Sequence, residues 1–163
     1  MLTKPSMSHI NNILTKCKAA IAASTTFDTE ANIFKREELK DDELDRSKIN
    51  IFVYPVDAVQ NETPVVVDFR KYRVRVVCRF EVDGRSNAAS ATDTVTENKS
   101  DYNDALKTAL EGMLPNGTYA ISNVFHVDYI STDFNFEPES PDGRDYVRVH
   151  RIAQLWEFHT YES

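Results

Sequence analysis

The chain has 163 residues, which fits one ordinary domain, so we expect a single domain over residues 1–163. Its 26 acidic and 19 basic side chains give a formal charge of -7, which argues against a generic phosphate-binding surface. The 4 glycines form no Gly-rich phosphate loop, and no apolar run is long enough for a membrane helix.

The first predicted element is an amphipathic helix over about residues 7–23. Ile10, Ile13, Cys17 and Ile21 recur at offsets of three and four, which places them on one stripe of a helix. That stripe is expected to face the core.

A charged segment follows the helix. A short strand is expected at Ile33 and Phe34, and residues 35–46 (KREELKDDELDR) then hold ten charges in twelve positions. We interpret residues 35–48 as a solvated loop inserted into the domain. Its carboxylates lack the glycine and the spaced oxygens of a calcium loop, so a cation site is disfavoured there.

Two strands are predicted next. Ile49 to Val53 alternate apolar and other side chains until Pro55 ends the pattern. Residues 72–82 are apolar at every even position, whereas their odd positions include three arginines, namely Arg73, Arg75 and Arg79. A period of two over this length predicts a long antiparallel strand with one apolar face.

Residues 85–100 are small and polar, so we interpret them as a second inserted loop. A second helix is predicted from Ser100 to Met113, and the run Leu114-Pro115-Asn116-Gly117 ends it. Two long strands close the chain as a hairpin, the first with a bulge near Ser131. The fold class is therefore α+β: an antiparallel or mixed sheet of four to five strands, with two helices on one face.

The last strand is apolar on both parities. We expect Val149 and Ala153 to face the helices, which leaves Ile152, Trp156 and Phe158 on the outer face. An exposed patch of this kind generally marks a partner surface. The alternative is that the bulge and the charged loop fold over it.

The cysteines and histidines indicate no reactive site. Cys17 and Cys78 occupy apolar positions and are interpreted as buried free thiols. No two histidines show the paired spacing of metal ligands on a helix. His126 and Asp128 share a strand face, the minimum for an acid/base pair, but no nucleophile motif accompanies them. We therefore expect no enzyme activity, no cofactor and no metal.

Four segments carry a family resemblance, namely INNILTKCKAAIAA, YRVRVVCRFEV, DYNDALKTALEGM and VRVHRIAQLWEFHTY. In order and length they resemble the tail terminator proteins of long-tailed bacteriophages, over about Ile10 to Tyr161. The resemblance implies a virion structural protein that forms a homohexameric ring. Such a ring caps the tail tube protein and meets the head connector, stopper or neck protein, while DNA passes through without specific binding.

The resemblance also implies roles for particular residues. Subunit contacts would involve Arg73, Arg75, Arg79, Ile152, Trp156 and Phe158. The loops at 35–46 and 85–100 would line the lumen or dock partners. In the first loop the candidates are Lys35, Arg36, Glu37, Glu38, Lys40, Asp41, Asp42 and Glu43.

The expected location is the tail or neck of the virion, after synthesis in the bacterial host cytoplasm and without a membrane. The arginine strand is interpreted either as a solvated face or as a surface that pairs with acidic residues of a neighbouring subunit. Two other functions remain open: another head–tail connector, stopper or neck protein, and a cytosolic ligand-binding domain or small enzyme.

Overall fold

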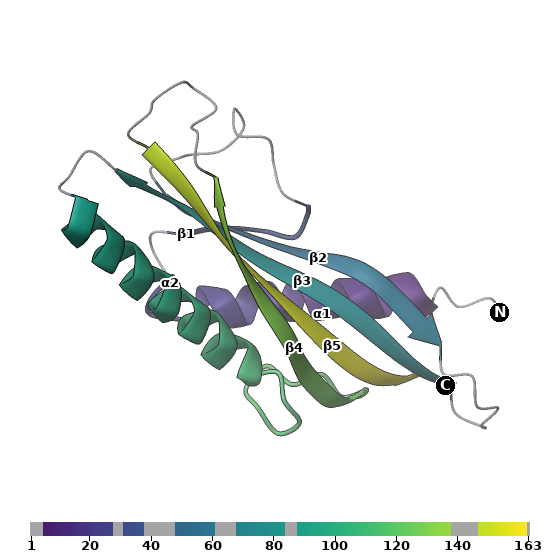
Figure 1. Ribbon diagram of the computed structural model, residues 1–163. Coiled ribbons are helices and arrows are strands. Elements are labelled where there is room, and N and C mark those ends of the chain that lie inside the picture. The colour runs from purple at the N-terminus through teal and green to yellow at the C-terminus, as the bar shows by residue number, and fades with distance from the viewer. Residues whose placement is uncertain are drawn as a thin grey trace.

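Two helices pack against one face of a five-stranded sheet (Figure 1). The computed structural model describes residues 5–27, 31–37, 48–60, 68–83, 88–137 and 147–162. The predicted α+β class is confirmed. In chain order the elements are α1 (Pro5–Ala22), β1 (Ala31–Phe34), β2 (Ile49–Gln60), β3 (Asp68–Asp83), α2 (Ala88–Glu111), β4 (Val124–Glu137) and β5 (Val147–Glu162).

The strand order in the sheet is β1-β2-β3-β5-β4. β1 runs parallel to β2, and the other neighbours are antiparallel, so the sheet is mixed. β3 and β5 pair along their whole length, from Asp68 opposite Glu162 to Asp83 opposite Val147. The long strand predicted from the period-two pattern is therefore central to the sheet, and β4 forms one edge.

β2 continues beyond the proline that was expected to end it. Pro55 lies at a register shift between β2 and β3, and the strand then resumes at Asp57. β1 pairs with Ile49 to Phe52, so among the described strands β2 is itself an edge strand from Val53 onward. An edge strand tolerates proline because the missing N–H faces no neighbour.

α2 begins earlier than the sequence predicted. Residues 88–100, interpreted as part of a polar loop at 85–100, form the first half of this helix. Three of them are alanines, the residue with the highest helix propensity, and a helix propagates readily from a turn that is already formed. The lack of bulky apolar residues therefore did not prevent a helix.

The main core lies between the sheet and the two helices. Cys17 on α1 and Leu106 on α2 pack there with the even-numbered side chains of β3, such as Val76. Ile152, Trp156 and Phe158 belong to this core and are 0%, 2% and 0% exposed.

The prediction that these three β5 side chains form an outward-facing interface is therefore wrong. The two faces of β5 are the reverse of those expected, since Val149 and Ala153 lie on the face that points away from the helices. On that other face Val149 and Ala153 are also buried, so apolar side chains on both sides of β5 are removed from water.

Candidate functional site

The sheet face that points away from α1 and α2 is called the open face below, and it carries the candidate site. Its side chains on β3 are the odd-numbered ones, because the even-numbered ones pack in the main core. A small second apolar group lies here, built from Phe52, Val77 and Ala153 and flanked by Phe34 and Tyr54. The rings of Phe34 and Phe52 stack with their centroids 5.4 Å apart.

The arginines predicted to meet a neighbouring subunit lie on this face, and Arg73 and Arg75 have acidic partners within the chain. Arg73 donates hydrogen bonds to both carboxylate oxygens of Asp57 across β2 and β3. These bonds hold the pKa of Asp57 below its usual value. Arg75 lies 3.8 Å from a carboxylate oxygen of Asp133 on β4. Arg79 is only 7% exposed, so it offers little contact surface.

The charged loop is described only at its start. Lys35, Arg36 and Glu37 are exposed, and the ammonium of Lys35 donates a 3.0 Å hydrogen bond to the hydroxyl of Thr15 on α1. The remaining docking candidates, Glu38, Lys40, Asp41, Asp42 and Glu43, lie outside the described residues.

Two histidines and two carboxylates form a cluster at one end of the open face. Nε2 of His126 lies 2.7 Å from Oδ1 of Asp128, two residues along β4. Nε2 of His159 on β5 lies 3.3 Å from Oδ2 of the same aspartate and 2.8 Å from Oε1 of Glu157. The two imidazole rings meet edge to face with their centroids 5.0 Å apart. We call these four residues the His–carboxylate cluster.

Strand register explains why these residues meet. His126 lies opposite His159, and Asp128 lies opposite Glu157, in the antiparallel pair of β4 and β5. Directly opposed residues bring their Cβ atoms within about 5 Å of each other. A register shift between Val124 and His126 changes the parity of β4, so that Val124 packs in the core whereas His126 points to the open face.

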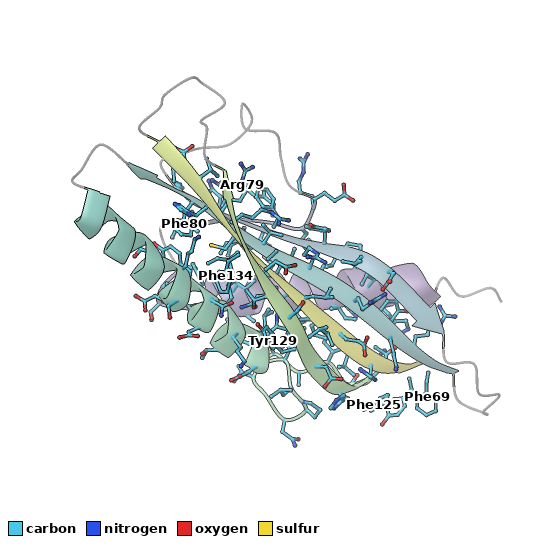
Figure 2. All side chains as sticks on the ribbon, in the orientation of Figure 1. Phe69, Arg79, Phe80, Phe125, Tyr129 and Phe134 are labelled. Atoms are coloured by element: carbon cyan, nitrogen blue, oxygen red, sulfur yellow. The ribbon has the colours of Figure 1, made fainter. Side chains whose placement is uncertain are left out.

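Aromatic rings border the cluster. Phe125 contacts the ring of His159 edge to face at 6.0 Å and stacks on Tyr161 at 4.7 Å. Phe69 on β3 completes this group, with centroids 5.7 and 5.8 Å from those of Phe125 and Tyr161. Figure 2 shows Phe69 and Phe125 side by side at the end of the sheet.

Large apolar side chains are exposed on and beside β4. Phe125 and Tyr161 are exposed at the end of the open face, and Ile130 and Phe134 are 47% and 51% exposed along β4. Figure 2 places Phe134 on this outer strand. At the opposite side of the sheet Val56 is 45% exposed on β2. Among the described residues of the sheet, the exposed large apolar side chains thus lie on β4, at the adjoining end of β5 and at Val56 on β2, and not at Trp156.

A groove of about 460 Å³ lies on the helical side, between the end of α1 and the last turns of α2. Ala20, Thr26, Thr108 and Tyr119 line it, and Asp104 is the only charged residue among its lining. One carboxylate does not supply an acid/base pair or a set of metal ligands.

The sequence predicted that His126 and Asp128 share a strand face, but not that Glu157 and His159 on β5 lie beside them. Helical spacing does not relate these histidines, because the cluster depends on cross-strand pairing of β4 and β5. The signal was present in the sequence: His126 and Asp128 in one strand of a predicted hairpin, and Glu157 and His159 in the other.

No protein-family model matches the chain, and no curated protein matches its sequence. Among the described residues, no helix combines the length and the apolar character needed to cross a membrane. The resemblance to tail terminators stays a prediction from the sequence.

Proposed function

We propose that the protein is a virion structural protein that assembles with copies of itself into a closed ring and acts as a tail terminator. One observation carries the assembly step: Ile130 and Phe134 are exposed on the β4 side of the sheet, and Val56 is exposed on the β2 side. Large exposed apolar side chains that gather in one place generally mark partner surfaces.

Cyclic assembly requires two different surfaces that fit each other, since the contact repeats head to tail until the ring closes. The β4 side carries Ile130 and Phe134. On the other side β2 runs beyond its pairing with β1, which gives the described part of the sheet a second edge. The two sides are separated by the width of the sheet (Figure 1). In the proposed ring, β4 of one copy packs against the β2 side of the next copy.

Charge supports the same role. The formal charge of -7 favours a lumen that repels the phosphates of DNA, so that DNA would pass without being bound. On the open face Arg73 and Arg75 are partly exposed even though they pair with Asp57 and Asp133. In the ring they would extend these ion pairs to carboxylates of the next copy. The tail tube protein and the head connector or neck protein would meet the two rims.

Multi-angle light scattering during size-exclusion chromatography tests the contact. We expect the wild type to elute as a closed oligomer, and Phe134→Asp to shift it to monomers because a charge replaces an interface aromatic. The expected loss is on the order of 2 kcal/mol per contact. Leu114→Asp is the matched control: Leu114 is also exposed, at 38%, but follows α2 instead of lying on a sheet edge. Equal behaviour of both variants would contradict the proposed interface.

A second experiment separates a tail terminator from another joint of the virion. Deletion of the protein should yield overlong tails, and antibodies against it should label the end of purified tails. Labelling of DNA-filled heads, with tails of normal length after deletion, would instead indicate a head stopper or neck protein.

A further inference from the structure

The His–carboxylate cluster has the composition of a metal site. His126, Asp128 and His159 each offer one ligand atom, and these atoms all lie within 4.8 Å of one another. In a tetrahedral zinc site with bonds of about 2.1 Å, neighbouring ligand atoms are about 3.4 Å apart. The separations of 2.7 Å and 3.3 Å between the aspartate oxygens and the two Nε2 atoms require only small adjustments.

The position of His159 gives an independent reason. Its Nε2 atom is buried and makes no well-aligned hydrogen bond within the described part of the chain, although carboxylate oxygens of Glu157 and Asp128 lie 2.8 and 3.3 Å away. A buried ring nitrogen without a hydrogen bond is costly to fold. A cation placed between this nitrogen and the two carboxylates would satisfy all three groups.

We propose that His126, Asp128 and His159 bind a divalent transition-metal ion of the Zn²⁺ class. Imidazole ligands favour such ions over Mg²⁺ and Ca²⁺, which prefer purely oxygen sites. Asp128 and Glu157 together balance the charge of one divalent ion. Glu157 lies beside His159, and water completes the coordination, since His126 and Asp128 are about half exposed.

Neighbouring cations leave room for this ion. Lys71 on β3 is opposite His159, and Arg73 is opposite Glu157. Arg73 already donates to both oxygens of Asp57, and Lys71 is exposed. Among the described residues, neither cation forms an ion pair with Asp128 or Glu157. This site is independent of the ring proposed above, because its ligands all come from one chain.

Isothermal titration with ZnCl₂ tests the site, with untagged protein that has first been treated with a chelator and dialysed. We expect one Zn²⁺ per chain and no competition from excess Mg²⁺. His126→Gln and Asp128→Asn should each weaken binding by at least roughly tenfold. Both side chains are about half exposed and lie outside the main core, so both variants should keep the circular dichroism spectrum of the wild type.

His9→Gln is the matched control, because His9 lies on α1 and its ring contacts Asn123 instead of the cluster. It should bind Zn²⁺ like the wild type. Co²⁺ provides a second measurement: tetrahedral coordination should give visible absorption in the wild type and in His9→Gln, and not in His126→Gln. Failure of the wild type to bind Zn²⁺, or binding that is unchanged in His126→Gln and Asp128→Asn, would overturn the proposal.

Discussion

The indole Nε1 of Trp156 donates a 2.9 Å hydrogen bond to Oε1 of Gln154, two residues earlier on β5. The amide nitrogen of Gln154 in turn donates to the backbone oxygen and to the side-chain Oδ1 of Asn103 on α2, at 2.9 and 2.8 Å. Gln154 and Trp156 are both buried, so this chain of bonds satisfies polar groups that water does not reach. It also joins α2 to the centre of the sheet.

Replacement of Gln154 by leucine should therefore destabilise the protein by about 2 kcal/mol, because Trp156 and Asn103 each lose a buried hydrogen-bond partner. Urea denaturation followed by circular dichroism measures this change. In a double-mutant cycle with Trp156→Phe, the double variant should lose less stability than the sum of the losses in the two single variants, since phenylalanine leaves no indole N–H to satisfy. Strict additivity would show that the Gln154–Trp156 bond contributes nothing.

The two cysteines should be unreactive in the folded protein. Cys17 and Cys78 are completely buried, and burial raises the pKa of both thiols far above its usual value. We expect Ellman's reagent to modify neither thiol in buffer and both in denaturant, because only the thiolate reacts. Rapid modification of native protein at either position would contradict the packing of α1 and β3.

Stability should fall in mild acid because of His150 on β5. Burial, with the nearby charge of Lys99, lowers the pKa of this side chain to about 4. The unfolded chain binds a proton at His150 below the ordinary pKa of about 6.5, whereas the folded chain does not. The free energy of unfolding should therefore decrease as pH falls from about 6.5 towards about 4, by more than about 1 kcal/mol for this residue.

His150→Phe is the matched variant, since His150 stacks on Phe80 with centroids 5.5 Å apart and phenylalanine preserves that contact. Thermal melts of both proteins across this pH range measure the difference. Parallel curves for wild type and variant would show that His150 does not titrate in this way. Asp57 acts at lower pH, because its pKa is already below the ordinary value and its contribution is lost only in stronger acid.

The elements with a regular apolar period were predictable from the sequence. The alternation on β3 identified the long central strand and placed Cys78 in the core, and the spacing of Ile13 and Cys17 identified α1. The bulge expected near Ser131 occurs between Tyr129 and Ser131. These features could be predicted because a helix or strand that is buried on one side repeats its apolar residues at a regular spacing.

Features that depend on pairing partners were not accessible. β5 is apolar on both parities, so the pattern alone did not tell which parity faces the helices, and Trp156 was assigned to the wrong face. The first half of α2 has no apolar stripe of bulky residues and was interpreted as a loop. The sequence shows the pair His126 and Asp128 and the pair Glu157 and His159 in the two strands of a hairpin, but it does not state the register that brings the two pairs together.

Electron microscopy of the purified, negatively stained protein tests the proposed self-assembly most directly. The account predicts closed rings of uniform size with an open centre, in which the β4 edge of each copy contacts the next one. Wild-type images that contain only single copies, or open filaments that never close, would contradict the ring and with it the proposed role at the end of the tail.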